Sequence, residues 1–170
     1  LRFAQEEQGW LPQGAMAAVA EATGYSQAYV ESVASFYDRL YLEPVGRRVI
    51  NVCVTLSCML RGSDDVLAAC KSKGLVKGGT TPDGLFTLNE VECLGACANA
   101  PMVQINDDNF EDLTFDSTVA LLEALAAGKP VKVGPQIDRQ TSCPEGGPSS
   151  LKDMALENHD YNRGSLRPCP

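Results

Sequence analysis

The sequence has a single histidine, and this scarcity excludes much metal and hydrolytic chemistry. His159 lies in a polar stretch of the 170-residue sequence. A Rieske centre needs two histidines on one iron. Zinc proteases, carbonic-anhydrase-type sites and Ser-His-Asp triads need a histidine elsewhere in the chain, beside their other catalytic groups. We therefore exclude these classes of site.

Positive charge and phosphate-binding motifs are also scarce. The chain has 14 Lys and Arg against 22 Asp and Glu, which gives a net charge of −8. Nucleic-acid binding needs a basic footprint, and adhesion to anionic lipid needs basic clusters. The sequence contains neither GxGxxG nor GxxxxGK[ST], so no nucleotide cradle is evident. We expect no nucleic-acid partner and no nucleotide site on this chain.

Long apolar runs are missing as well. No stretch approaches the length of a membrane span, so we expect no direct insertion into a membrane. No signal peptide is recognisable. The sequence starts at Leu1, without Met, inside an expected helix. The sequence therefore does not exclude a targeting segment upstream of Leu1.

Composition divides the chain into residues 1–46, 47–133 and 134–170. With 44% apolar residues, a chain of this length can bury the core of one ordinary domain with extensions. Pro44 and Gly46 interrupt the first pattern and mark a boundary. The last region is rich in Pro, Gly, Ser and charge. It is predicted to be an extended tail that wraps a partner or stays disordered.

The first region is predicted to form a small helical bundle. Gly9 ends a first helix, and an Ala-rich second helix covers residues 13–23 and ends at Gly24. Ser26 is a suitable N-cap for a third helix. The apolar residues on one face of this third helix are Tyr29, Val30, Val33, Phe36, Tyr37 and Leu40.

The second region alternates strands with helices, which is typical of an α/β domain. One helix is expected to start at Ser63 with an acidic first turn and to end at Gly74. Another is expected to be capped by Thr114 or Asp116. The expected strands are residues 48–54, 85–90, 102–105 and a short strand near Phe110.

Four of the seven cysteines fall into two tight pairs. Cys53 and Cys58 have four residues between them, and Cys93 and Cys97 have three. Each pair follows an expected strand, so the first sulfur is fixed at a strand end and the loop folds back to bring the second to the same centre. Gly95 allows the tight backbone that this needs. Disulfide scaffolds are usually shorter and richer in loops, so the pattern favours a metal site.

Spacing alone leaves three metal sites open. Structural zinc accepts four cysteines with spacers of two to four residues, but the Cys-x₂-Cys form is commoner and neither pair has it. A mononuclear iron site meets the same objection. A [2Fe–2S] cluster has two irons that each take two thiolates, so wider spacers suit it. A thioredoxin-type redox disulfide needs Cys-x-x-Cys, which is absent. The spacing therefore favours the cluster and leaves zinc as an alternative.

Longer motifs around these cysteines resemble a known family. They are QEEQGWLP at 5–12, VASFY at 33–37, CVTLSCMLRG at 53–62, TPDGLFTLNEVECLGAC at 81–97 and NAPMVQIN at 99–106. In this order they resemble the thioredoxin-like [2Fe–2S] subunit of respiratory complex I, NADH:quinone oxidoreductase, over roughly residues 3–133. The segment GPQIDRQTSCPEGGPSSL at 134–151 resembles alphaproteobacterial and mitochondrial complex I more than other relatives.

The resemblance implies a thioredoxin-like domain that carries one [2Fe–2S] cluster on Cys53, Cys58, Cys93 and Cys97. It implies a flavoprotein partner that binds FMN and NADH, together with other complex I subunits. The chain would then be an electron-transfer subunit of an oxidoreductase, not catalytic alone. It would lie in the peripheral arm, on the bacterial cytoplasmic or mitochondrial matrix side of the inner membrane. Equivalent subunits occur in NAD-dependent formate dehydrogenases and hydrogenases, which remain the alternatives.

The other cysteines and one proline carry separate expectations. Cys70 falls on the apolar side of an expected helix and is predicted to be a buried small residue. Cys143 and Cys169 lie in the tail and are not expected to be ligands. The implied fold predicts a cis peptide bond before Pro101, beside the second cysteine loop. Phe36 and Tyr37 fit either core packing or the partner-facing motif that the resemblance implies.

Overall fold

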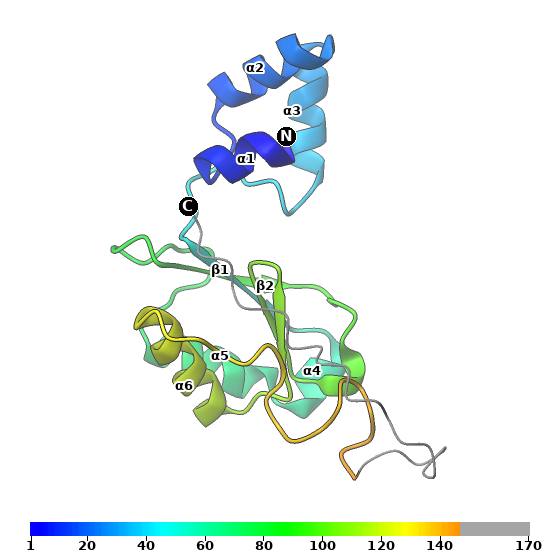
Figure 1. Ribbon diagram of the computed structural model, residues 1–170, viewed down its shortest axis with the longest axis vertical. Helices are drawn as coiled ribbons and strands as arrows, with labels where there is room; N and C mark the ends of the chain where they lie inside the picture. Colours follow the sequence, from blue (N-terminus) through cyan, green and yellow to red (C-terminus); the bar gives the residue numbers. More distant parts are fainter. Residues whose placement is uncertain (147–170) are drawn as a thin grey trace. The chain divides into compact units, whose positions relative to one another are not determined.

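The structure is a computed structural model that describes residues 1–146. It divides into two compact units, the first covering Leu1–Arg47 and the second beginning at Arg48. Figure 1 shows helices alone in the first unit and a sheet with helices in the second. The expected α/β architecture is confirmed.

The first unit contains the three expected helices, α1 (Arg2–Gln8), α2 (Gln13–Thr23) and α3 (Gln27–Phe36). The Ser26 hydroxyl accepts a hydrogen bond from the Tyr29 backbone N–H at 3.3 Å, so the predicted N-cap of α3 is confirmed. Gln5 ties the unit together, because its side-chain amide donates to the Arg39 carbonyl and accepts from the Tyr41 N–H. The buried residues between the helices are Leu11, Met16, Ala20, Val30 and Ala34.

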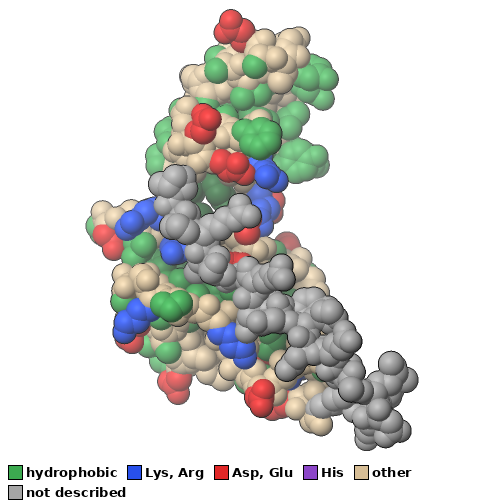
Figure 2. Space-filling model, viewed as in Figure 1, with side chains coloured by type: hydrophobic (Ala, Val, Ile, Leu, Met, Phe, Trp, Pro, Cys, Tyr) green, Lys and Arg blue, Asp and Glu red, His purple; other side chains and the backbone are tan. Residues whose placement is uncertain are grey.

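The buried face of α3 differs from the expected one. The helix ends at Phe36 rather than near Leu40, because Tyr37 is extended. Val30 and Ala34, four residues apart, face the core, where their small side chains allow close helix packing. Tyr29, Phe36 and Tyr37 belong to the apolar face expected from the sequence, but each is more than half exposed. Figure 2 shows hydrophobic side chains on the surface of this unit. Core packing therefore does not explain Phe36 and Tyr37.

The second unit is built on a five-stranded sheet with the order β2-β1-β3-β4-β5. β1 pairs in parallel with β2 and antiparallel with β3, and β3 pairs antiparallel with β4. β5 pairs in parallel with β4. The strands are β1 (Arg48–Cys53), β2 (Phe86–Val91), β3 (Val103–Ile105), β4 (Asp108–Glu111) and β5 (Gly134–Pro135).

Helices α5 and α6 pack side by side against the sheet (Figure 1). Thr114 is the N-cap of α6, in a capping box with Ser117, so that expectation is confirmed. Helix α5 begins at Ser63, as expected, but Gly62 occupies the N-cap position, so the interpretation of Ser63 as the cap is wrong. The helices of this unit are α4 (Leu56–Arg61), α5 (Ser63–Ser72), a 3₁₀ turn η1 (Cys97–Asn99) and α6 (Phe115–Ala126).

The structure adds short elements that the sequence did not predict, among them η1, α4 and β5. Helix α4 lies within the expected loop of the first cysteine pair. Strand β5 extends the sheet with residues that were expected to belong to an extended tail. The predicted cis bond before Pro101 is confirmed. Within the described residues, no helix is long and apolar enough to cross a membrane.

Candidate metal centre

The two cysteine pairs start at the same edge of the sheet. Cys53 is the last residue of β1, and Cys93 follows the end of β2 by two residues. β1 and β2 are parallel neighbours in which Cys53 is the register partner of Val91. The carboxyl ends of parallel strands meet at one edge of a sheet, so the sheet itself brings the two pairs together. This arrangement explains how ligands far apart in sequence can serve one centre.

The first pair is buried. Cys53 is 2% exposed and Cys58 is 1% exposed, and both pack against Ala100 and Met102. The Cys53 N–H donates to the Met102 carbonyl at 3.3 Å, which ties the strand end to the segment after Pro101. The expected loop is a short helix, because α4 begins directly after Thr55 and carries Cys58 in its first turn. Packing therefore fixes both sulfurs of this pair.

The second pair is exposed. The Sγ atoms of Cys93 and Cys97 lie 3.3 Å apart without a disulfide. Gly95 lies between them at φ 87°, a left-handed conformation that favours glycine, as the sequence predicted. Its backbone N–H points to the Cys93 sulfur at 3.4 Å. The two sulfurs of this pair are exposed, while Leu94 and Ala96 between them are partly buried against the first pair.

The surroundings divide each pair into one thiol that ionises more readily and one that ionises less readily. Burial opposes ionisation of Cys53, but hydrogen bonds from the Thr55 hydroxyl and N–H outweigh it and lower the pKa. Burial, followed by the neighbouring Cys53, raises the pKa of Cys58 to about 11. The Gly95 N–H, followed by Cys97, lowers the pKa of Cys93. Hydrogen bonding to Cys93 raises the pKa of Cys97. Metal ligation requires thiolates, so loading this site releases protons.

Two hydroxyl residues belong to the site although sequence reasoning missed them. The Thr55 Oγ1 lies 3.2 Å from the Cys53 sulfur. The same hydroxyl also lowers the pKa of Cys93, so it acts on both pairs. The Ser57 hydroxyl partly opposes the increase in the pKa of Cys97, which its contact with Cys93 causes. The available signal was a Thr and a Ser inside the spacer between Cys53 and Cys58.

The donor set fits a two-iron cluster. A [2Fe–2S] cluster takes two thiolates on each of two irons, which two separate pairs of free thiols can supply. The N–H of Gly95 and the hydroxyl of Thr55 can serve as hydrogen-bond donors to the sulfurs.

The remaining cysteines lie elsewhere. Cys70 lies on the core-facing side of α5 and is fully buried, as predicted, and burial raises its pKa to about 11. Cys143 is partly buried in the segment after β5. Cys169 lies outside the described residues.

Comparison with known proteins agrees with this geometry. Residues 1–126 match the family described as "Thioredoxin-like [2Fe-2S] ferredoxin". The chain is 46% identical over 153 residues to "NADH dehydrogenase [ubiquinone] flavoprotein 2, mitochondrial" of Dictyostelium discoideum, covering 89% of this chain and 62% of that protein. It is 44% identical over 156 residues to an NADH-quinone oxidoreductase subunit of Rhizobium meliloti, covering 89% of this chain and 57% of that protein.

This chain thus spans about three fifths of the length of these two relatives. Among solved structures, a chain of an NAD⁺-reducing [NiFe]-hydrogenase in the H₂-reduced state is similar, with a TM-score of 0.66 at 22% identity. The similarity covers 76% of this chain and 22% of that chain. At this identity the match shows a shared fold.

Proposed function

This chain belongs to the thioredoxin-like [2Fe–2S] ferredoxin family, and on that premise we propose that it holds one [2Fe–2S] cluster and passes single electrons. The observation that supports the proposal most directly is the start of both cysteine pairs at the shared end of β1 and β2. The proposed ligands are Cys53, Cys58, Cys93 and Cys97.

The chain's own residues would hold and tune the cluster. The buried pair supplies sulfurs fixed by packing against Ala100 and Met102. The exposed pair depends on the left-handed Gly95, whose N–H points to sulfur. When bound, a [2Fe–2S] cluster takes up and releases one electron at a time. The Thr55 hydroxyl stabilises negative charge on sulfur, and so helps to set the potential at which the electron is held.

We propose that the electron donor is a flavoprotein subunit that binds FMN and NADH. NADH delivers a hydride, which carries two electrons, whereas the proposed site exchanges one at a time. The sequence contains no phosphate-cradle motif of its own. The names of the two relatives point to NADH:quinone oxidoreductase, respiratory complex I. The other complex I subunits are further proposed partners, and the exposed aromatics Phe36 and Tyr37 suit a docking surface.

The proposed location is the peripheral arm of complex I, on the bacterial cytoplasmic or mitochondrial matrix side of the inner membrane. The equivalent subunit of an NAD-dependent hydrogenase or formate dehydrogenase is the second candidate, supported by the shared fold of the hydrogenase chain. Affinity purification from the native source separates these cases. Proton-pumping membrane subunits should accompany the chain in the first case, and a hydrogenase or formate dehydrogenase in the second.

The proposal that a flavoprotein partner, and not this chain, oxidises NADH is tested by mixing NADH with the cluster-loaded full chain under anaerobic conditions. Low-temperature EPR should detect no rapid reduction until the flavoprotein partner is added. Rapid reduction without any flavin would contradict this proposal. A colourless preparation that contains zinc would instead support a structural zinc module, the remaining alternative.

A further inference from the structure

Arg139 forms a nearly buried, two-pronged ion pair with Asp112. Its Nε donates to Oδ2 of Asp112 at 2.9 Å, and its Nη2 donates to Oδ1 at 2.8 Å. The two side chains are only 9% and 8% exposed. A fork of this kind fixes both position and angle, and lysine cannot reproduce it. The pair therefore joins the segment after β5 to the end of β4 with defined geometry.

The same guanidinium also reaches the second cysteine loop. Nη2 of Arg139 donates to the Ala98 carbonyl at 2.8 Å, and Ala98 directly follows Cys97. Asn99, which is 2% exposed, donates from its side-chain amide to the Thr141 carbonyl at 2.8 Å. The Asp112 N–H donates to the Asn99 carbonyl at 2.8 Å. The loop backbone after Cys97 is thus held from two sides.

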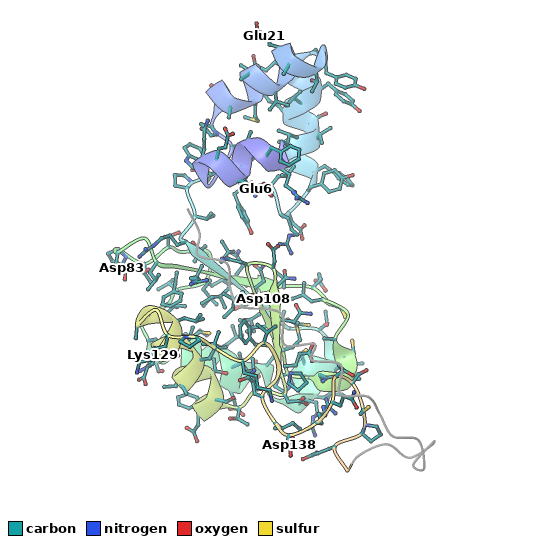
Figure 3. All side chains as sticks on the ribbon, in the orientation of Figure 1. Glu6, Glu21, Asp83, Asp108, Lys129 and Asp138 are labelled. Carbon is teal, nitrogen blue, oxygen red and sulfur yellow. The ribbon has the colours of Figure 1, made fainter. Side chains whose placement is uncertain are left out.

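Strand β5 brings Arg139 to this position. Its pairing with β4 is continued by the Gln136 N–H, which donates to the Glu111 carbonyl at 2.9 Å. Nη1 of Arg139 then donates to the Cys143 carbonyl at 3.2 Å and closes the turn of its own segment. Figure 3 labels Asp138, the neighbour of Arg139, on this segment. Every side-chain nitrogen of Arg139 therefore has an acceptor.

Such an anchor matters because the second cysteine pair lacks packing. Cys93 and Cys97 are exposed, whereas Cys53 and Cys58 are buried. Between the two cysteines, only Leu94 and Ala96 pack, and both are only partly buried, so the shape of this loop depends largely on its backbone contacts. The contacts from Arg139, Asp112 and Asn99 lie within two residues of Cys97.

We propose that Arg139 is a positioning residue that clamps the Cys93–Cys97 loop, so that the segment after the sheet controls how firmly the cluster is held and in what environment. This inference rests on the proposed function. Groups that orient metal ligands from outside typically change metal affinity by about 10- to 100-fold when they are removed. Loss of Arg139 acts through the loop backbone, because the hydrogen bonds of Arg139 go to carboxylate and carbonyl oxygens rather than to a cysteine sulfur.

The test compares variants of the cluster-loaded full chain. Arg139→Met removes every hydrogen-bond donor of this side chain. Arg139→Lys keeps the positive charge but cannot form the two parallel hydrogen bonds to Asp112. Release of iron to a chelator should be on the order of tenfold faster in Arg139→Met, with Arg139→Lys between it and the wild type. The EPR spectrum of the reduced cluster should change in Arg139→Met. Hydrogen exchange over residues 93–101 should rise, with or without the cluster.

A matched control separates clamping from general destabilisation. Leu122→Ala opens a cavity in the core beneath α6 and should lower the melting midpoint. It should leave the EPR spectrum and the exchange of residues 93–101 unchanged. Lys73→Met removes the exposed ion pair with Glu123 and controls for loss of a cation.

The possible outcomes distinguish the clamp from the proposed function. A wild-type chain that holds its cluster while Arg139→Met retains iron and loop protection equally well would overturn the clamp alone. Equal changes in Arg139→Met and Leu122→Ala would also overturn it, because they would show only a stability effect. A wild-type chain that binds zinc and no cluster would overturn the proposed function, and with it the role of the clamp.

Discussion

Cys53 and Val91 are register partners at the carboxyl ends of the parallel strands β1 and β2. Because Cys93 follows Val91 by two residues, both cysteine pairs begin at one sheet edge. The hydrophobic core under that sheet includes Val52, Leu88 and Val103, all almost fully buried. The sheet therefore brings the starts of both cysteine pairs together at one edge.

Removing the cluster should lower the melting midpoint of the full chain. Ligands supplied by two distant loops convert binding energy into folding energy. A contribution of a few kcal/mol corresponds to a shift of roughly 10 °C or more for a domain of this size. Calorimetry of the loaded and the apo chain measures the shift. Equal midpoints would show that the cluster adds nothing to the stability of the core.

Thr55→Val should make the reduction potential of the cluster more negative. The Thr55 hydroxyl lies 3.2 Å from the Cys53 sulfur, and donors to sulfur favour the more negative, reduced state. A difference of about 1 kcal/mol between the two states corresponds to roughly 40 mV for one electron. Thr55 makes no side-chain cap of α4, so valine removes no cap.

Thr55→Ser is the matched control, because it keeps the hydroxyl. EPR-monitored redox titration should place Thr55→Ser near the wild type and Thr55→Val below it. A Thr55→Val potential equal to that of the wild type would show that this hydroxyl does not tune the site.

Gly95→Ala should destabilise the second cysteine loop by about 1–2 kcal/mol, the cost of a left-handed conformation for an L-residue. No heavy atom lies within 4 Å of an added Cβ, so the cost comes from the backbone and not from crowding. Gly95→Asn should cost less, because asparagine tolerates this conformation. Urea denaturation of the apo chain gives the free energy of unfolding of Gly95→Ala, Gly95→Asn and the wild type. Equal stability of Gly95→Ala and the wild type would contradict the positive φ at this position.

Part of this site was predictable from sequence and part was not. The spacing of Cys53, Cys58, Cys93 and Cys97 and the strands before them carry local signals, namely tight pairs and β-branched runs. Helix α4 has six residues and β5 has two, which is too short for periodicity to emerge. The contact between Asp112 and Arg139 spans 27 positions. No local pattern encodes a contact of that range, because it depends on β5 pairing with β4.

The α3 helix also has one feature that the sequence predicts and one that it does not. Its start was predictable, since Ser26 is a strong capping residue. Its buried face was not, because the apolar face includes the large aromatics Tyr29 and Phe36, which are exposed, while the small Ala34 is buried in the core. Burial of a face depends on the shape of the neighbouring helices, which sequence periodicity does not contain.

Cys70 predicts how stability changes at alkaline pH. Burial raises its folded-state pKa from 9.0 to about 11. The folded chain therefore holds this proton more tightly than the unfolded chain. The resulting stability is fully present below pH 9 and is lost as pH rises toward 11, at up to about 1.4 kcal/mol per pH unit.

Cys70→Ala should therefore lower stability at neutral pH through a cavity but flatten its alkaline decline. Urea denaturation of the apo chain between about pH 8 and pH 10 gives the two slopes. Parallel slopes for Cys70→Ala and the wild type would show that Cys70 ionises with its ordinary pKa.

The most direct test of the central claim is metal and sulfide analysis with EPR on the full chain and its single Cys→Ser variants. We predict about two irons and two acid-labile sulfides per wild-type chain, as a [2Fe–2S] cluster requires. Serine at Cys53, Cys58, Cys93 or Cys97 should abolish or strongly perturb the spectrum, whereas Cys143→Ser should leave it unchanged. Zinc in place of iron, or loss of the cluster in Cys143→Ser, would contradict the assignment.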